Sequence, residues 1–145
     1  MQNTETAKYI GIMTESLEKK HKIFEQLLSK TEAQSECILG KDYEDANWAQ
    51  FEVLMIEKDS LIDAVNDLDT GFDSLFERVK PEFDRCKDDY SKEIKRLQSL
   101  ITGLTDLGVK ISATEERNRR EVERIMTAAK AGIGKARKNM RASSG

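Results

Sequence analysis

The sequence predicts an all-α fold: an elongated antiparallel helical hairpin followed by a long third helix, packed as a three-helix bundle or coiled coil. The chain of 145 residues is 38% hydrophobic and 35% charged, which is too apolar for disorder and charged enough for extended helices with little interior. One proline and eight glycines leave few places for turns. Apolar residues recur at steps of three, four and seven, the spacing of a helix face. We therefore expect a single helical domain over residues 1–145.

The first helix is predicted over residues 4–39. Thr4 or Thr6 would cap its exposed amide groups, and Gly40 suits the left-handed position that follows a helix end. One face repeats every seven residues at Ile10, Leu17, Phe24, Thr31 and Ile38. The turn after Gly40 is short, so the first two helices should form an antiparallel hairpin.

The second helix is predicted over residues 43–79, and it carries the face around which the others should pack. Asp42 would cap it, with Asp45 three residues later as an approximate capping box. Pro81 should end it, because proline disfavours helical geometry at the residue before it. The main apolar stripe comprises Phe51, Leu54, Leu61, Val65, Leu68, Phe72, Leu75 and Val79. The stripe is widened by Met55, Ile62 and Phe76. A helix with so wide a stripe is predicted to meet two neighbours.

The third helix is predicted over residues 83–140, because two seven-residue series continue through that stretch in one register. The first series is Phe83, Tyr90, Leu97, Leu104, Ile111, Asn118 and Ile125. The second series is Ile94, Ile101, Gly108, Glu115, Val122, Ala129 and Ala136. Gly103 and Gly108 each cost up to about 1 kcal/mol relative to alanine, so a bend or break near them is an alternative. Ser112 or Thr114 would then cap a fourth helix, but the shared register favours one continuous helix.

Unequal helix lengths predict a working surface at the C-terminal end. At 1.5 Å per residue the second helix would span roughly 50 Å and the third roughly 80 Å, so the last turns, within residues 114–145, should overhang the hairpin. This segment holds nine Lys or Arg against four Glu, about +5, which leaves about −8 for the first 113 residues given the total of −3. Its remaining apolar face needs cover from a self-dimer, a folded-back segment or a partner protein.

No pattern in the chain indicates catalysis, a metal site or a cofactor. His21 is the only histidine, and beside Phe24 and Leu28 a structural or exposed role is expected for it. The carboxylates fit a solvated helix face better than an acid–base pair, and no phosphate-binding motif is present. We therefore expect neither an enzyme nor a small-molecule substrate.

The cysteines and the hydropathy indicate a compartment. Cys37 and Cys86 lack metal-ligand spacing, which suggests two reduced thiols in a cytosolic protein. The chain does not open with a secretory pattern, and no apolar run approaches the roughly 18–20 residues of a membrane span. We expect a soluble cytoplasmic protein without membrane insertion.

Two further surface features have two interpretations each. Trp48 and Phe51 are either binding anchors or, as we favour, packing at the end of the bundle.

Four arginines could hold a phosphate backbone, but four glutamates are interleaved with them at the spacing of helix ion pairs. These arginines are Arg117, Arg119, Arg120 and Arg124. An uncontested basic patch follows at Lys135, Arg137, Lys138 and Arg141. Nucleic acid binding through it would be steeply salt-dependent and is not the favoured interpretation.

The hairpin and the second helix resemble a known family. The residues concerned are Leu39-Gly40-Lys41-Asp42-Tyr43, Lys58-Asp59-Ser60-Leu61-Ile62-Asp63, Leu68-Asp69 and the later Glu116-Arg117-Asn118. This arrangement is similar to the bacterial flagellar export chaperones of the FlgN type and the related FliT type. In these, a long helix ends in a short turn, and the next helix carries a lysine followed by a leucine-rich run. The FlgN C-terminal helix often has a second asparagine soon after the first, whereas Arg119-Arg120-Glu121 follows Asn118 here, so the subfamily stays open.

The resemblance implies a cytoplasmic, non-enzymatic chaperone of flagellar type III export. Such chaperones bind the C-terminal helical segments of hook-associated (junction) proteins and deliver them to the export apparatus. The alternative is a structural coiled-coil or adaptor protein that forms a homodimer through the same apolar helix face. Concentration-dependent mass separates the two, because a dimer seam would be buried before any client arrives.

The overhang is the predicted client site. A disordered amphipathic segment could lay its apolar face on the overhang and fold as it binds, and the cost of ordering suits a chaperone that must release its cargo. The predicted contacts are Val122, Ile125, Met126, Ala129 and Ile133, with Arg120 and Arg124 as flanking charges. On this hypothesis, Ile125→Asp abolishes client binding and leaves helicity intact.

Overall fold

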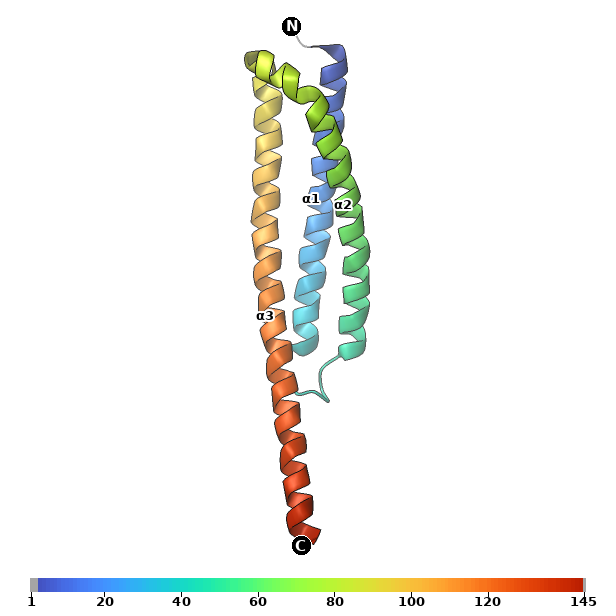
Figure 1. Cartoon of the computed structure of the whole chain (residues 1–145), viewed down its shortest axis with the longest axis vertical. Helices are drawn as coiled ribbons and strands as arrows, with labels where there is room; N and C mark the ends of the chain where they lie inside the picture. Colours follow the sequence, from blue (N-terminus) through green and yellow to red (C-terminus); the bar gives the residue numbers. More distant parts are fainter. Residues whose placement is uncertain (1–2, 145) are drawn as a thin grey trace.

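The computed structural model describes residues 3–144, with side chains up to Arg141. Its elements in chain order are α1 (Thr4–Ile38), α2 (Trp48–Arg85), the 3₁₀ helix η1 (Lys87–Tyr90) and α3 (Ser91–Ser144). Within the described residues there is no strand. The all-α fold is confirmed: α1 and α2 form an antiparallel hairpin, and α3 runs the length of the molecule beside α1 and continues past the hairpin loop (Figure 1).

The first helix has the predicted end and a different cap. Asn3 caps α1, since its side-chain oxygen accepts hydrogen bonds from the backbone N–H groups of Glu5 (2.9 Å) and Thr6 (3.4 Å). The prediction that Thr4 or Thr6 is the cap is therefore wrong. Gly40 has a φ of 68°, which confirms the left-handed residue expected after the helix.

The hairpin loop is longer than predicted, and α2 begins at Trp48 rather than residue 43. Asp42 initiates a turn instead of a helix, because its carbonyl accepts the N–H groups of Asp45 (3.1 Å) and Ala46 (3.0 Å). The cap is Asn47, whose side-chain oxygen accepts the N–H of Gln50 at 3.1 Å. The Asp42–Asp45 capping box is thus wrong.

Pro81 lies inside α2, and the prediction that it ends the helix is wrong. Proline removes one backbone hydrogen bond, but burial on both sides of it holds the chain: Val79 is 0% and Phe83 8% exposed. The last turns of α2 lean across the end of the bundle toward α3 (Figure 1). Tyr90 of η1 completes this end, fully buried, with its hydroxyl accepting the backbone N–H of Asn3 at 2.9 Å.

The continuity of the third helix is confirmed, since α3 runs unbroken for 54 residues through Gly103 and Gly108. Its predicted start at residue 83 is wrong, because Phe83 still belongs to α2 and α3 begins at Ser91 after η1. α3 spans roughly 80 Å at 1.5 Å per residue. Thr114 does not cap a fourth helix. Its hydroxyl donates to the carbonyl of Lys110 one turn earlier, at 2.9 Å.

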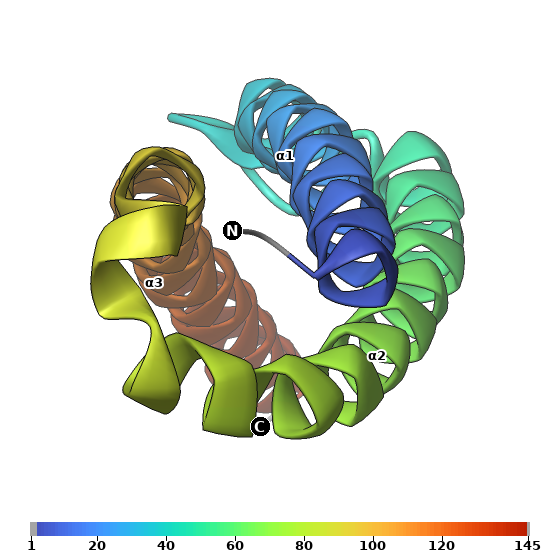
Figure 2. The same cartoon turned by 90° about the horizontal axis from the view of Figure 1, so that it is seen from above.

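The three long helices form an open arc with α1 in the middle (Figure 2). α1 packs against both α2 and α3, whereas in the described chain no Cα of α2 lies within 8 Å of a Cα of α3. The prediction that both other long helices meet α2 is confirmed only in part: the backbones of α2 and α3 stay apart, but their side chains meet, as in the Lys58–Glu115 ion pair. The extra apolar residues of the wide α2 stripe, such as Ile62 and Phe76, face the open space between the two helices.

Two buried clusters hold the arc together. The larger lies toward the η1 end and comprises Ile10, Met13, Leu17, Val79, Phe83, Tyr90, Leu97 and Leu104. The smaller lies at the hairpin loop and comprises Cys37, Ile38, Leu54 and Ile125. The first seven-residue series of α3 supplies buried residues to both clusters. Among the described residues, no helix combines the length and apolar content that crossing a membrane requires.

Candidate functional site

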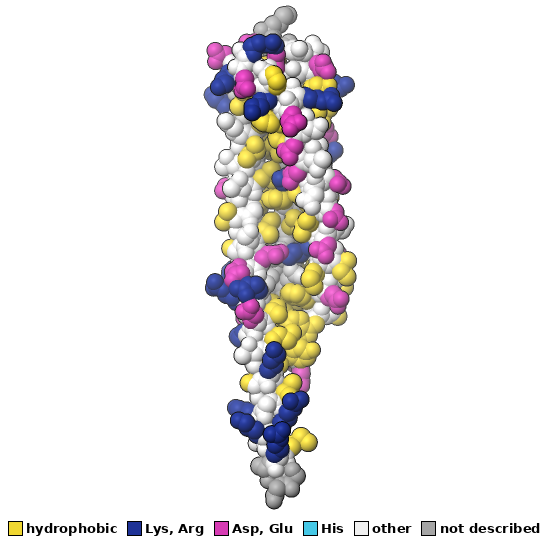
Figure 3. Space-filling model, in the orientation of Figure 1, with side chains coloured by type: hydrophobic (Ala, Val, Ile, Leu, Met, Phe, Trp, Pro, Cys, Tyr) yellow, Lys and Arg dark blue, Asp and Glu magenta, His cyan; other side chains and the backbone are white. Residues whose placement is uncertain are grey.

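An open groove runs between α2 and α3, with α1 as its floor; we call it the α2/α3 groove. It contains hollows of about 770, 690 and 400 Å³ from the η1 end toward the hairpin loop. Large apolar side chains line it while staying exposed: Met55 (46%), Ile62 (44%), Phe76 (41%) and Ile101 (45%). Figure 3 shows hydrophobic side chains gathered along this middle line of the molecule.

The groove walls follow directly from the helical periodicity. Met55, Ile62 and Phe76 lie at multiples of seven residues along α2, so they share one side of that helix. On α3 the opposite wall is the second seven-residue series, including Ile94, Ile101 and Gly108. Both helices thus present an apolar line that has no partner helix in the described part of the chain. A fourth helix placed between them would complete a four-helix bundle.

The α2 wall is strongly acidic. Between Phe51 and Glu77, α2 carries eight Asp or Glu against the single lysine Lys58. Asp59 and Asp73 line the groove itself. A helix lying in the groove would meet apolar side chains at its centre and carboxylates along the α2 edge, so cations on that edge would complement it.

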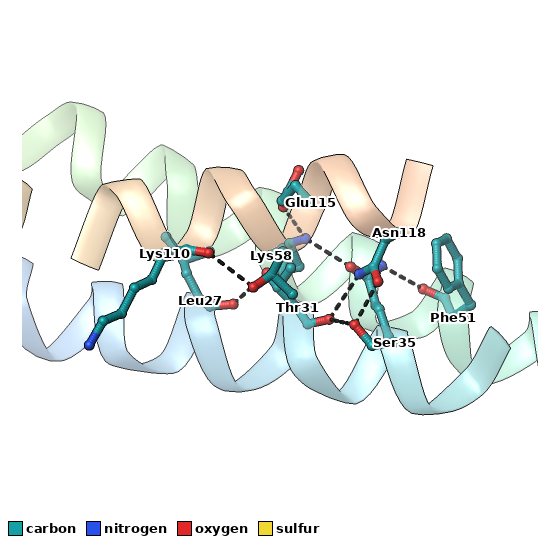
Figure 4. Close-up of polar contacts among 10 residues, drawn as sticks. Leu27, Thr31, Ser35, Phe51, Lys58, Lys110, Glu115 and Asn118 are labelled. Carbon is teal, nitrogen blue, oxygen red and sulfur yellow. Dashed lines mark hydrogen bonds and ion pairs between the residues drawn. The ribbon is translucent and has the colours of Figure 1, made fainter. Parts of the chain in front are cut away.

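A buried polar layer crosses all three helices beneath the loop-side part of the groove (Figure 4). Asn118 of α3 is 7% exposed; its Nδ2 donates to the carbonyl of Thr31 at 3.0 Å, and its Oδ1 accepts the hydroxyl of Ser35 at 2.6 Å. Thr31, fully buried, donates to the carbonyl of Leu27 at 2.7 Å. Every polar group named here has a partner, so the layer can fix the register of α3 on α1 without leaving unpaired polar atoms.

Lys58 is the charged member of this layer and joins α2 to both other helices. Lys58 is only 8% exposed. Its ammonium group donates to the side-chain oxygen of Gln34 at 2.8 Å and pairs with Glu115 of α3. Gln34 in turn donates to the carbonyl of Phe51 at 3.2 Å. Lys58 thus satisfies its charge at the groove floor, where it sets the spacing of α2 and α3.

The overhang, residues 126–144 of α3, holds only some of the predicted client contacts. Ile125 is 1% exposed and belongs to the loop-side cluster, so it cannot reach a partner unless the bundle opens. Val122 packs against that cluster and lines the loop end of the α2/α3 groove. Met126 and Ile133 are 37% and 55% exposed, and Ala129 is partly exposed.

The two predicted flanking charges are engaged within the molecule. Arg120 pairs with Glu116 at 3.2 Å. Arg124 pairs with Glu121 at 2.6 Å and donates to the carbonyl of Lys41 at 2.7 Å, while Glu121 accepts the N–H of Gly40 at 3.0 Å. The Arg124 hydrogen bond and the Gly40 amide lower the pKa of the Glu121 carboxyl. This pair fastens the hairpin loop to α3.

Glutamate–arginine pairs at helical spacing cover the outer surface of α3, as predicted. Arg119 pairs with Glu116 at 2.6 Å and also with Glu123. The hydrogen bond from Arg119, with help from Arg120, lowers the pKa of the Glu116 carboxyl to about 2. These arginines are therefore neutralised locally.

A separate hollow of about 590 Å³ lies between the overhang and the hairpin loop. Its loop side is Asp42, Tyr43, Glu44 and Asp45, and its α3 side includes Ala129, Ile133 and Ala136. Three carboxylates of the loop thus stand opposite a helix that carries no Asp or Glu after Glu123. The apolar side of the overhang that lines this hollow remains partly exposed to solvent.

The remaining candidates are structural in their placement. Trp48 and Phe51 stack edge-on with ring centroids 5.9 Å apart and pack against the loop-side cluster, as favoured above. His21 Nδ1 lies 2.7 Å from a carboxylate oxygen of Glu25. Cys37 and Cys86 are free thiols. Among the described residues no three His, Cys, Asp or Glu side chains converge as a metal site.

Sequence reasoning missed the α2/α3 groove, although its signal is present. The wide stripe of α2 and the second series of α3 are more apolar than contact with α1 alone requires. The wide stripe of α2 was predicted to meet two neighbouring helices, whereas the structure leaves it facing the second α3 series across open space. No protein-family model, no curated protein and no solved structure matches the chain.

Proposed function

We propose that the chain is a chaperone that binds an amphipathic helical segment of another protein in the α2/α3 groove. The observation that supports this proposal is the pair of unpartnered apolar walls on two helices whose backbones stay apart along the groove. Helix-in-groove recognition uses apolar side chains at helical spacing along one face of the client. The space left by the open arc is of the kind that a fourth helix fills.

The groove would bind by burying apolar surface, at about 25 cal/mol per Å² removed from water. A disordered client must also pay for folding, which offsets part of that gain. The buried polar layer holds α2 and α3 at a fixed spacing through the Lys58–Glu115 pair, so the groove is already formed before the client arrives. A preformed groove favours binding of the client, and the entropy that the client loses on folding favours its release.

The proposed clients are the C-terminal helical segments of flagellar junction proteins, held in the cytoplasm for type III export. The support for this identity is the sequence resemblance to FlgN-type and FliT-type chaperones. Two residues that carry the resemblance, Lys58 and Asn118, lie in the polar layer below the groove. Val122 at the loop end of the groove, and Met126, Ala129 and Ile133 beyond it, would extend the contact with a long client.

Calorimetric titration with C-terminal peptides of the junction proteins from the same organism tests the proposal. We expect binding to the parent chain and an at least tenfold loss for Ile62→Asp and for Ile101→Asp, since every tenfold in affinity is about 1.4 kcal/mol. Matched controls are Ile56→Asp and Val109→Asp, whose parent residues are 63% and 64% exposed and line none of the groove hollows. Equal losses in all four variants, or no binding by the parent chain, would overturn the proposal.

A further inference from the structure

The groove and the overhang have complementary properties within the same chain. The groove is long, apolar along its centre and acidic along α2. The overhang is an apolar helix face on a segment whose only charges are positive: Lys130, Lys135, Arg137, Lys138 and Arg141. In Figure 3, Lys and Arg side chains gather at the narrow end of the molecule, beyond the body that carries most of the Asp and Glu. The two surfaces cannot meet within one chain, because the overhang points away from its own groove (Figure 1).

The groove and the overhang have similar lengths. At 1.5 Å per residue, the α2 wall from Met55 to Phe76 extends roughly 32 Å, and residues 126–144 make roughly 28 Å of helix. The apolar stripe of the overhang follows steps of three and four, as a helix inserted into a bundle requires. It comprises Met126, Ala129, Ile133 and Ala136. The overhang therefore has the length and the face of the missing fourth helix.

The groove wall and the overhang stripe are also continuous on α3. Ile94, Ile101 and Val122 line the groove, and Ala129 and Ala136 continue the same seven-residue series beyond the loop. Two copies placed antiparallel about a two-fold axis would therefore face each other along one unbroken side of both α3 helices. In that arrangement each overhang lies in the groove of the partner, as an isologous interface requires.

We propose that the overhang of a second copy of this chain occupies the α2/α3 groove, giving a reciprocal antiparallel dimer. Apolar side chains of the overhang bury Ile62 and Phe76, and its lysines and arginines lie against the α2 carboxylates. This self-association goes beyond the proposed chaperone function and is not needed for it. A client helix and the overhang of the second copy would compete for the same groove.

The mass of the protein in solution, measured by sedimentation at chain concentrations from about 1 to 200 μM, tests the dimer, since self-association depends on concentration. We expect the mass to rise from 16.5 kDa toward twice that value. Charge reversal by Lys130→Glu with Arg137→Glu should raise the dissociation constant at least about tenfold. The double substitution Asp59→Lys and Asp73→Lys should by itself raise the dissociation constant to a similar extent. Combined with Lys130→Glu and Arg137→Glu in one chain, it should restore the dimer. A monomer at every concentration, or reversal without effect, would overturn the proposal.

Disulfide trapping tests the geometry independently of affinity. In a Cys86→Ser background, Ile62→Cys protein mixed with Ile133→Cys protein should form a covalent heterodimer under mild oxidation. Each variant alone should give far less, because the proposal pairs groove with overhang and not like with like. Val109→Cys mixed with Ile133→Cys is the control. Equal trapping in the control would show a different interface, and neither experiment uses a client, so their failure leaves the chaperone proposal standing.

Discussion

Single residues of the polar layer decide how the helices are aligned. Asn118, Lys58 and Gln34 lie where apolar side chains would pack equally well in several registers. Hydrogen bonds between Asn118 and α1, and between Lys58 and Gln34, are satisfied in only one register. A buried polar group that loses its partner costs more than an apolar mismatch, so the layer selects one alignment of α2 and α3 on α1.

Asn118→Ala should destabilise the fold by about 1 to 3 kcal/mol, because it leaves the carbonyl of Thr31 and the hydroxyl of Ser35 without this partner. Urea unfolding followed by circular dichroism measures the change. Asn66→Ala, at an exposed position of α2, is the control and should change stability by less than about 0.5 kcal/mol. Equal stability of Asn118→Ala and the parent chain would show that the polar layer does not stabilise the fold.

The Glu116 carboxylate gives the chain a specific acid sensitivity. Its pKa is lowered from 4.5 to about 2, mainly by the hydrogen bond from Arg119. A lowered folded-state pKa stabilises the fold above the unfolded-state value, and this contribution is lost as the pH falls through about 2. Glu116→Gln should therefore lose less stability than the parent chain between pH 4.5 and 2.

Urea midpoints measured across that pH interval test this prediction, and the difference should shrink in high salt because the ion pairs are exposed. Glu52→Gln, at an exposed carboxylate of α2 outside these ion pairs, should follow the parent chain. Parallel pH profiles for Glu116→Gln and the parent chain would contradict the prediction.

At the scale of the helical elements, α3 changes role along its length. Up to Ile125 its first seven-residue series is core, and beyond Ile125 the same helix has no hairpin to pack on. The boundary is set by the loop, which Arg124 and Glu121 fasten to α3. This division explains why periodicity alone could not separate core from working surface: the pattern is continuous across the boundary.

Truncation of two isoleucines of α3 should affect stability to very different extents. Ile125→Ala should cost about 2 to 5 kcal/mol, because it opens a cavity in the loop-side cluster. Ile133→Ala, at a side chain that is 55% exposed, should change stability by less than about 0.5 kcal/mol. Thermal unfolding at a concentration that keeps the chain monomeric compares them. Similar costs for both would mean that the overhang is packed in solution. By the same reasoning, Ile125→Asp should unfold the loop end and not act as a clean binding variant.

Two glycines should respond oppositely to alanine. Gly40 has a φ of 68°, so Gly40→Ala should cost about 1 to 2 kcal/mol. Gly103 is helical, and an added Cβ would stand 3.8 Å from the His21 ring, an ordinary contact. Gly103→Ala should therefore stabilise the chain by up to about 1 kcal/mol through helix propensity. Chemical denaturation checks both, and destabilisation by Gly103→Ala would indicate that α3 uses this glycine to bend.

At the scale of the whole molecule, the sequence predicted much of the fold and little of the site. Helical periodicity and Gly40 predicted the hairpin and the long α3, because local spacing determines those features. The predicted ends of α2 were wrong. A turn begins at Asp42, so the helix starts only after its cap at Asn47, and the burial of Val79 and Phe83 outweighs the effect of Pro81. The open groove depends on where helices do not meet, which no local pattern encodes.

A methyl NMR spectrum tests most directly whether a client helix binds in the α2/α3 groove. Isoleucines lie both in the groove and on exposed faces outside it, and their δ1-methyl signals can be followed as a junction-protein peptide is added. We expect the methyl signals of Ile62, Ile101 and Ile111 in the groove to shift, while those of the exposed Ile12 and Ile56 stay unchanged. Shifts at Ile12 or Ile56 with a silent groove would contradict this expectation, as would an unchanged spectrum at saturating peptide.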